Sequence, residues 1–521
     1  MKKTLQVEMK YANSVLNIVL DTLKLKKQAL VFVNSKNSAE AEAERIAAKV
    51  KPEGEDALAL EALSEKVLNA LEKPTKQCKR LALCVKSGAA FHHAGLHSKQ
   101  REIVEDSFRN GTLKVICATP TLAYGLNLPA FRVIVRDLKR FAPPRGMSPI
   151  PVLEFLQFCG RAGRPDFNED YGEAICIAET DTEKENIMER YVDGEPEDIL
   201  SKLAVEPILR TYVLSLIAIE YCNSEERLME FFGKTFYAHQ FQNTERLEEI
   251  IDRILGYLED WEFIEWSEDG KKVSATLLGQ RVSQLYLDPY TANYLITCMK
   301  RGEVKMIRDF SFLQMVSYTL ELRPLLTVRA SEYERIESEM VEKSSCILSM
   351  EPTMYDDDYD EYVKSIKTAL FMLDWINEVD EETLLEAYNI RPGEVRAKLD
   401  LADWLLYSSE ELAKLAKMQG LIKEIAKLRV RLKHGAKEEL LPLLKLKNVG
   451  RVRARKMYQN KIKDLEDVKK IDPGMLAEIV GKAIAIDIKK QVGIELRDSH
   501  IIVKKGTRKG QMSLHKYGKG K

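Results

Sequence analysis

The sequence predicts a parallel α/β domain at the N-terminal end and mostly helical domains after it. In the first 180 residues, short β-rich runs alternate with segments of helical periodicity. This alternation is typical of a parallel sheet that helices cover on both faces, because each strand is then a short buried run. After about residue 195 such runs become rare. The four predicted strands are Ala29–Asn34, Lys114–Ala118, Arg132–Val135 and Ala174–Ile177.

Helix signals separate these strands. The segment Ser98–Asn110 has a candidate N-cap in Ser98 and a glycine, Gly111, after its last turn. Serine favours a helix start and glycine favours a helix end. Residues 53–73 are rich in Ala, Leu and Glu, and they are predicted to form an extra solvated helix within the α/β domain.

Later in the chain, Phe263–Ser274 contains two short alternating runs around an Asp-Gly turn, which predicts a β-hairpin. Helices followed by one hairpin favour a winged helix. We therefore expect an α/β domain at 1–197, a winged helix at 198–278, an all-helical domain at 279–432, a small helical domain at 433–503 and a basic flexible tail at 504–521.

The composition fits a globular protein of three or four domains. The chain has 521 residues, of which 45% are apolar and 31% are charged. Its net charge is −1, but this value hides a separation of charge. Residues 442–463 hold eight basic side chains and no acidic one, residues 501–521 hold seven and none, and an acidic cluster lies at 356–361.

The eight cysteines are scattered without a C-x-x-C pair, which favours a reduced intracellular protein. No signal peptide and no apolar span of membrane-crossing length are evident. We therefore expect a cytoplasmic protein without a membrane partner.

The strongest chemical signal is the segment Gln157-Phe-Cys-Gly-Arg-Ala-Gly-Arg-Pro165. It places Arg161 and Arg164 three residues apart among glycines that allow a close backbone approach. Guanidinium groups in this setting suit the charge on a transferring phosphoryl group. The alternative is a basic loop that caps a helix.

A second motif, Ala118-Thr-Pro-Thr-Leu-Ala-Tyr-Gly-Leu-Asn-Leu-Pro129, begins where a predicted strand ends. Ligands of doubly wound sheets lie at the carboxyl ends of strands, so Thr119, Gly125 and Asn127 are candidates to contact phosphate or ribose. Thr119 is alternatively a simple helix cap. The neighbouring pair His92-His93 lacks a carboxylate or cysteine at ligand spacing, and we predict no metal site.

The segment Leu446–Tyr458 resembles a helix-hairpin-helix, in which an Asn-Val-Gly turn leads into a helix N-terminus that favours a phosphate. Its basic side chains would contact the DNA backbone without reading sequence. The alternative is a solvated basic helix. The candidate residues are Lys447, Arg451, Arg453 and Arg455.

Four motifs occur together in an order that resembles a known family: Phe32-Val-Asn-Ser35, HHAGL, TPTLAYGLNLP and QFCGRAGRP. They resemble the second RecA-like domain of a superfamily-two helicase of the Ski-like kind. The closest resemblance is to the archaeal Hjm DNA helicases, relatives of the helicase part of polymerase theta. The segments FFGKTFYAHQF and EVRAKLDLADWLLYS resemble the winged-helix and ratchet segments of that family. The resemblance therefore covers nearly the whole chain.

The resemblance implies an ATP-dependent DNA helicase in which ATP and Mg²⁺ lie between two RecA-like domains. Arg161 and Arg164 match the arginine-finger motif, with Gln157 in support. Asn127 holds the position near the ribose, where many relatives carry Asp, and Thr119 matches a residue that contacts the nucleic-acid backbone. Movement from 3′ to 5′ on forked or branched DNA, in repair or fork restart, is implied in the same way.

The family also has a strand-separating hairpin between the two motifs. Here the interval contains Lys139-Arg-Phe-Ala-Pro-Pro-Arg-Gly-Met147, in which Arg140 and Phe141 are the candidates for DNA contact. The alternative is an ordinary surface loop.

In the ratchet domain of this family, an Arg and a Trp on one helix contact the translocating strand. Arg396 and Trp404 are the candidates. On a helix these two positions lie about 80° apart, whereas positions seven apart lie about 20° apart. The better-aligned position is Ala397, so Trp404 is the firmer candidate for base stacking. Core packing is the alternative for this tryptophan.

The sequence lacks a phosphate-binding P-loop and an Asp-Glu pair for magnesium. Gly233-Lys-Thr235 fits the end of a P-loop, but Leu228 stands where its first glycine would be. We therefore expect ATP and Mg²⁺ to be held mostly by a missing first RecA-like domain on a partner chain, and the isolated chain to be inactive. The alternatives are a non-catalytic branched-DNA binding module and a Ski-like RNA helicase fragment.

The tail Gly510-Gln-Met-Ser-Leu-His-Lys-Tyr517 resembles a degenerate sliding-clamp peptide. Gln511, Leu514 and Tyr517 would be its contacts with the clamp. The alternative is an unstructured basic tail.

Overall fold

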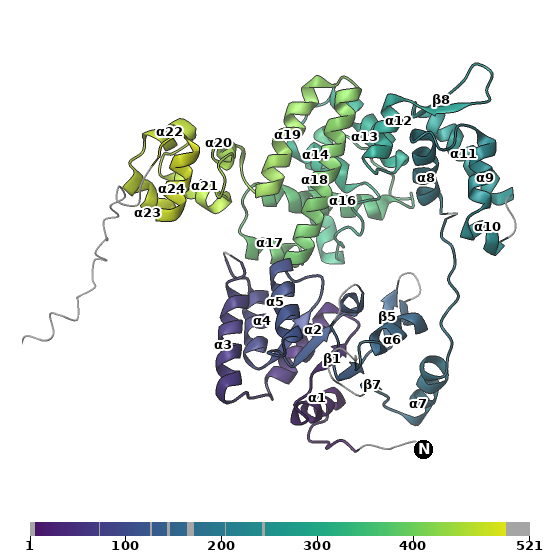
Figure 1. Cartoon of the computed structure of the whole chain (residues 1–521). Helices are drawn as coiled ribbons and strands as arrows, with labels where there is room; N and C mark the ends of the chain where they lie inside the picture. The colour runs from purple at the N-terminus through teal and green to yellow at the C-terminus, as the bar shows by residue number, and fades with distance from the viewer. Residues whose placement is uncertain are drawn as a thin grey trace, which may run out of the picture. The chain divides into compact units, whose positions relative to one another are not determined.

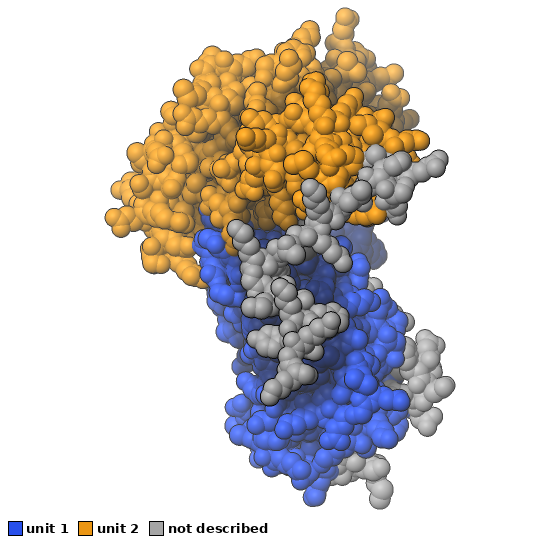
Figure 2. All heavy atoms as spheres, turned by 90° about the vertical axis from the view of Figure 1, so that its left-hand side faces the viewer, with its two compact units in different colours: residues 1–204, 233–243, 381–398 blue, residues 205–232, 244–380, 399–521 orange. Residues whose placement is uncertain are grey.

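The computed structural model describes residues 6–71, 73–124, 128–142, 146–163, 171–203, 205–241 and 245–495. The chain divides into two compact units, which Figure 2 shows in two colours. Unit 1 comprises residues 1–204, 233–243 and 381–398, and unit 2 comprises residues 205–232, 244–380 and 399–521. A division into two units does not test the predicted boundaries of the four domains, which therefore stay a prediction.

A five-stranded parallel sheet forms the centre of unit 1 (Figure 1), with the strand order β2-β3-β1-β4-β7. Every residue of the first four of these strands is buried. Because successive side chains of a strand point to opposite faces, both faces of the sheet must be covered. The strands are β1 (Ala29–Phe32), β2 (Ala89–His92), β3 (Val115–Ala118), β4 (Arg132–Val135) and β7 (Glu173–Cys176).

The predicted strands agree with β1, β3, β4 and β7 to within two residues at either end. Strand β2 was not predicted, because its four residues run directly into the histidine and glycine residues of the HHAGL motif. The predicted N-cap at Ser98 was wrong by one residue. Helix α5 (Ser98–Arg109) has His97 as its N-cap, and the imidazole accepts the Lys99 N–H at 3.3 Å.

Helices and one hairpin complete the described part of unit 1. The predicted solvated helix within 53–73 is confirmed as α3 (Gly54–Leu68), which packs on α4 (Lys76–Lys86). The hairpin joins β5 (Lys139–Ala142) to β6 (Gly146–Pro149) in antiparallel register. The other helices are α1 (Ser14–Lys24), α2 (Lys36–Ala47), α6 (Val152–Cys159), α7 (Asp181–Ile187), α10 (Phe236–Phe241) and α17 (Glu381–Ala387), and short turns lie at η1 (Pro120–Ala123) and η3 (Met188–Val192).

Unit 2 is helical apart from one hairpin in its described residues. The predicted hairpin is confirmed as β8 (Ile264–Trp266) and β9 (Val273–Ala275), with Gly270 at a φ of +67° in the turn. This hairpin packs against α8 (Glu206–Ala218), α11 (Glu245–Asp260) and α12 (Leu277–Gln284). The next helices are α9 (Glu225–Gly233), α13 (Pro289–Gly302), α14 (Asp309–Ser317), α15 (Tyr333–Lys343), α16 (Tyr359–Ile376) and α19 (Gln419–His434).

The long helix α18 (Pro392–Leu415) begins among the residues of unit 1 and continues through residues of unit 2. The C-terminal helices of unit 2 enclose a hydrophobic core of their own, which includes Leu440, Met457 and Leu476. These helices are α20 (Leu441–Leu444), α21 (Arg451–Gln459), α22 (Leu465–Lys470), α23 (Pro473–Val480) and α24 (Lys482–Gln491). In the described part of the chain, every helix is too short or too polar to cross a lipid bilayer.

Candidate functional site

The two motif loops of unit 1 meet at the carboxyl edge of the sheet. Strand β3 ends at Ala118 and leads into η1, and the Gly160–Gly163 turn follows α6. The Arg161 guanidinium donates a hydrogen bond to the Ala123 carbonyl, which joins the QFCGRAGRP segment to the TPTLAYG segment. Backbone bonds of 3.0 Å and 2.8 Å also hold the turn beside Ala130, just before β4. The structure thus brings together two segments that the sequence separates.

Packing fixes helix α6 beneath this turn. Phe158 stacks on Phe32 of β1 with a centroid separation of 4.4 Å. One turn of helix from Arg161, the buried Oε1 atom of Gln157 has no hydrogen-bond partner among the described residues. A buried amide oxygen without a partner is uncommon in proteins and marks a place where an external group could bind. Gly163 has a φ of +55° and lies so close to Gly172 that a side chain would overlap its backbone. The second glycine of the motif is therefore required sterically.

Thr119 is buried directly after β3, and its hydroxyl lies 3.1 Å from that of Thr121. Thr119 precedes η1, but its side chain makes no capping hydrogen bond. Gly125, Asn127 and Arg164 lie outside the described residues.

The β5–β6 hairpin presents different side chains on its two faces. Phe141 and Met147 are cross-strand partners and are 69% and 57% exposed. Arg140 points to the other face, where it forms an ion pair of 2.8 Å with the buried Glu154 of α6. Burial raises the pKa of Glu154, and the charge and hydrogen bond of Arg140 partly oppose this shift. The hairpin is therefore anchored on one face and apolar on the exposed face.

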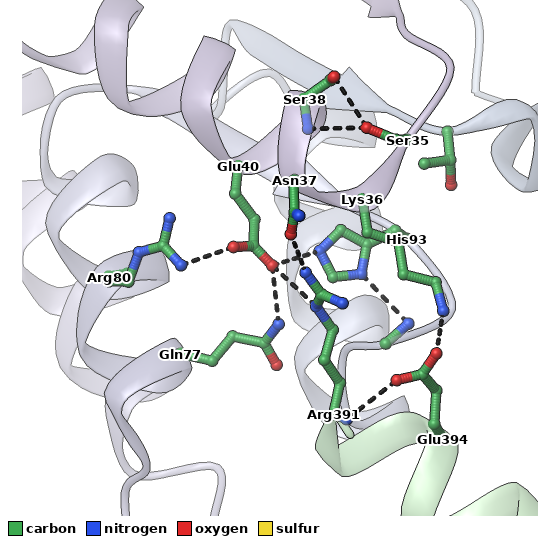
Figure 3. A network of polar contacts seen from close by, with 12 residues as sticks. Ser35, Lys36, Asn37, Ser38, Glu40, Gln77, Arg80, His93, Arg391 and Glu394 are labelled. Carbon is green, nitrogen blue, oxygen red and sulfur yellow. Dashed lines mark hydrogen bonds and ion pairs between the residues drawn. The ribbon is translucent and has the colours of Figure 1, made fainter. Parts of the chain in front are cut away.

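A polar network surrounds Glu40 in α2 (Figure 3). The carboxylate accepts hydrogen bonds from Arg80 at 2.5 Å and from Gln77, His93 and Arg391 at 3.1 to 3.2 Å. The His93 Nδ1 accepts the Gly95 N–H at 3.1 Å, so the ring proton must lie on Nε2, toward Glu40. Burial alone would raise the pKa of Glu40, but these donors outweigh it and lower the pKa to about 2. Burial also lowers the pKa of His93.

The Glu40 network connects residues 381–398 to the α/β part of unit 1. Lys36 forms an ion pair with Glu394, and Lys76 forms one with Glu386. The Gly393 N–H donates to the Gly95 carbonyl at 3.0 Å. Sequence reasoning did not find these contacts, because Glu40 and Arg391 are 351 positions apart and neither belongs to a recognisable motif. His92, the other histidine of the pair, lies 2.8 Å from Glu105.

Trp404 is half-buried on α18, and its indole N–H donates to the Leu285 carbonyl at 3.2 Å. Arg396 and Ala397, which lie about two helical turns before Trp404, are both exposed. The hydrogen bond to the Leu285 carbonyl fixes the N–H edge of the Trp404 ring within the protein.

The helix α21 begins at Arg451, directly after the Asn-Val-Gly turn, as the sequence predicts. Its basic side chains have partners within the protein. Arg455 forms ion pairs with Glu378 at 2.7 Å and with Glu439 at 2.9 Å. Burial alone would raise the pKa of Glu378, but the hydrogen bond from Arg455 lowers it. Arg455 is therefore largely neutralised where it lies.

The other basic candidates in and before this helix have different contacts from those of Arg455. The Arg451 guanidinium lies over the Trp375 ring, 4.6 Å from its centroid. Arg453 donates to the Asn448 carbonyl at 3.1 Å, and Lys447 is exposed in the turn. The Arg451 ring contact and the Arg453 hydrogen bond are both with neutral groups.

The Gly-Lys-Thr segment at 233–235 begins at the last residue of helix α9 and follows no strand, unlike the phosphate-binding loop that it superficially resembles. Among the described residues, no group of three or more His, Cys, Asp or Glu side chains is placed to hold a metal ion. Gln511, Leu514 and Tyr517 of the tail lie outside the described residues.

Most of the parallel sheet and the arginine-bearing turn lie within a match to a helicase domain. Residues 11–166 match the family described as the helicase conserved C-terminal domain, and residues 310–435 match the archaeal helicase domain 4.

Three relatives give a narrower assignment, and each is described as ATP-dependent DNA helicase Hel308. That of Methanocella arvoryzae is 39% identical over 92% of this chain and 65% of its own length. Those of Pyrococcus abyssi and Pyrococcus horikoshii are 40% and 39% identical over 93% and 96% of this chain, and over 67% and 68% of their own lengths. The chain belongs to the Hel308-type family of archaeal DNA helicases. It spans about two thirds of the length of these relatives, and the resemblance inferred from the motifs is confirmed.

Proposed function

We propose that this chain is the arginine-finger and DNA-handling portion of an ATP-dependent DNA helicase that moves 3′ to 5′ on forked or branched DNA, in repair or fork restart. One observation carries the proposal. At the carboxyl edge of a RecA-like sheet, Arg161 connects the two motif loops, in a chain about 40% identical to Hel308 helicases.

The residues at this edge suit a polyphosphate. The Arg161 guanidinium lies at this edge and donates a hydrogen bond to a carbonyl, which is a neutral acceptor. The Gln157 amide adds a polar group whose oxygen has no partner among the described residues; as an acceptor, this oxygen would pair with a donor such as water and not with the phosphate itself. ATP would bring the phosphoryl group, and Arg161 and Arg164 would stabilise the charge that develops on it. We assign ATP and Mg²⁺ binding mostly to a P-loop domain, supplied by another chain or another segment.

For strand separation we propose the β5–β6 hairpin. The exposed Phe141–Met147 pair presents an apolar edge to the first base pair of a fork, while the pairing of Arg140 with Glu154 anchors the hairpin. An aromatic wedge that replaces base stacking lowers the free energy of opening a base pair.

The remaining domains would guide the DNA. We propose a winged helix at 198–278, a ratchet domain at 279–432 that carries Trp404, and a helix-hairpin-helix domain at 433–503. Lys447, Arg451 and Arg453 would contact phosphates. Clamp binding through Gln511, Leu514 and Tyr517 stays a prediction.

The test is to mix the chain with a P-loop RecA-like chain and to measure DNA-stimulated ATP turnover and fork unwinding. Turnover should appear on mixing and should fall about 1,000-fold or more with Arg164→Ala. Phe141→Ala should reduce unwinding and leave ATP turnover intact. Ser148→Ala, on the opposite face of the same hairpin, is the matched control.

Two outcomes would contradict the proposal. If the chain binds fork DNA but no P-loop chain supports turnover, it is a non-catalytic branched-DNA binding module. If RNA stimulates turnover better than DNA does, the RNA helicase alternative is favoured.

A further inference from the structure

Tyr286 has an unusual backbone conformation at the end of α12. The helix ends with Leu285 as its C-cap, and the Tyr286 N–H donates to the Ser283 carbonyl at 3.1 Å. Tyr286 has a φ of +56°, in the left-handed region. This position after a helix is usually glycine, because a side chain there is strained and bulky residues rarely adopt it.

The Tyr286 side chain has little stabilising contact with the rest of the protein that would offset this strain. It is 84% exposed. Among the described residues, its ring stacks on no other aromatic ring and its hydroxyl makes no hydrogen bond. Strained positions with exposed side chains occur preferentially at functional sites. A tyrosine here therefore requires a reason other than stability.

The same turn holds Trp404. The carbonyl that accepts the Trp404 indole N–H belongs to Leu285, the residue directly before Tyr286. One helical turn beyond Trp404, Tyr407 lies at the surface, where its hydroxyl accepts a hydrogen bond from Arg281 of α12 at 3.3 Å. Arg429 lies over the Tyr407 ring, 4.9 Å from its centroid. Three aromatic side chains are thus gathered around the end of α12.

The charges at this surface favour bases over phosphates. Arg281 is paired with Glu411, and Arg429 is paired with Asp403 and Glu410. Because carboxylates already neutralise these arginines, little net positive charge remains to attract a phosphate. Exposed rings, in contrast, can stack on any base.

We propose that Tyr286 is a second stacking residue, which receives the base next to the one on Trp404 in a single DNA strand. The inference rests on the proposed function, in which Trp404 contacts the translocating strand. Tyr286 would increase the number of bases held at one time without reading their sequence.

The experiment measures binding of the full chain to a fluorescently labelled single-stranded oligothymidine by anisotropy. Tyr286→Gly should weaken binding roughly tenfold, because one base–aromatic stack is lost. The unfolding temperature should stay the same or rise, since glycine relieves the left-handed strain. Tyr286→Phe keeps the ring and should bind like the unchanged protein.

Glu220→Gly is the matched control. Glu220 follows the C-cap of α8 with a φ of +59°, so its change to glycine relieves the same strain at the end of a different helix. It should not weaken binding. An oligonucleotide of abasic sites should bind the unchanged protein and Tyr286→Gly equally, because it offers no base to stack.

The possible failures are distinguishable. If the unchanged chain binds single-stranded DNA and Tyr286→Gly binds it equally well, the inference is wrong and the proposed function stands. If the unchanged chain does not bind single-stranded DNA, the proposed function fails. A loss of binding accompanied by a lower unfolding temperature would assign Tyr286 a structural role and overturn the inference.

Discussion

Two clusters hold arginines from distant segments, and their charges are arranged in opposite ways. Glu40 lies between two guanidinium groups, those of Arg80 at 2.5 Å and Arg391 at 3.1 Å. Arg455 instead lies between two carboxylates, those of Glu378 at 2.7 Å and Glu439 at 2.9 Å. In each cluster one charged group is central, and the two oppositely charged groups on either side of it repel each other.

The comparison identifies the side chain that each cluster cannot lose. When the central group is removed, two like charges remain near each other without an opposite charge between them. When an outer group is removed, one ion pair survives. The carboxylate is therefore critical in the first cluster and the arginine is critical in the second.

Glu40→Gln is expected to have the largest effect. The change keeps the side-chain shape but removes the negative charge that pairs with both Arg80 and Arg391. The loss of this charge should lower the free energy of opening of residues 381–398 by about 3 kcal/mol. Amide hydrogen exchange over residues 381–398 measures the free energy of opening of that segment. Glu44→Gln removes the more exposed of the two carboxylates that pair with Arg80 and should cost less than about 1 kcal/mol. Equal losses in the two variants would show that Glu40 is no more important to the cluster than Glu44.

Arg455→Ala should have the second-largest effect. It should lower the free energy of opening of α21 by about 2 kcal/mol, because it leaves Glu378 and Glu439 without their hydrogen-bonded cation. The cost is lower than at Glu40 because these groups are more accessible to water. Exchange of the α21 amides is the measurement. Lys456→Ala, an exposed change on the same helix, should lie within about 0.5 kcal/mol of zero; a comparable loss there would point to the helix itself.

Lowering the pH from 7.5 to 5.5 should affect the two clusters differently. The free energy of opening of residues 381–398, at the Glu40 cluster, should fall by about 1 kcal/mol relative to that of α21, at the Arg455 cluster. Burial lowers the pKa of His93 beside Glu40, Arg391 and Lys36, so the unfolded chain takes up a proton that the folded chain refuses. This stability is present above pH 6.5, the ordinary pKa, and is lost as the pH falls below it.

Exchange of residues 381–398 should therefore accelerate at the lower pH, after correction for the intrinsic rate, and exchange of α21 should not. His93→Gln should abolish the difference, and His97→Gln should leave it. His434, whose pKa burial also lowers, is replaced by Gln in all samples. A response of α21 in that background would contradict the prediction.

Glu439→Gln should have the smallest effect, about 0.5 kcal/mol or less, because Arg455 keeps both of its hydrogen bonds to Glu378. Exchange of the α21 amides checks this as well. If Glu439→Gln were as costly as Arg455→Ala, the central position of Arg455 would have no special importance.

Local patterns were enough to predict much of the fold. The apolar runs identified β1, β3, β4 and β7, and the Asp-Gly turn identified the β8–β9 hairpin. These features depend on residues close together in the chain. Strand β2 was missed because its last residue, His92, belongs to a polar motif, and a four-residue run has too little periodicity to stand out.

The candidate site was less predictable for a physical reason. The contact of Arg161 with Ala123 spans 38 positions, and the pairing of Arg455 with Glu378 spans 77. Such contacts depend on how helices pack, which local residue patterns do not contain. The basic character of α21 was evident from sequence, but the neutralisation of Arg455 was not.

The close approach of Gly95 and Gly393 limits how this sequence can vary over evolutionary time. Their backbones share a hydrogen bond, and a methyl group at Gly393 would overlap the carbonyl oxygens of Ala94 and Leu96. A neighbouring ion pair such as Lys36 with Glu394 can be exchanged for another pair of similar length. A larger residue at Gly393, in contrast, would displace backbone, and one at Gly95 would displace the Arg391 side chain. In a distant homologue whose charges have changed, a glycine at both positions would still mark this attachment of residues 381–398.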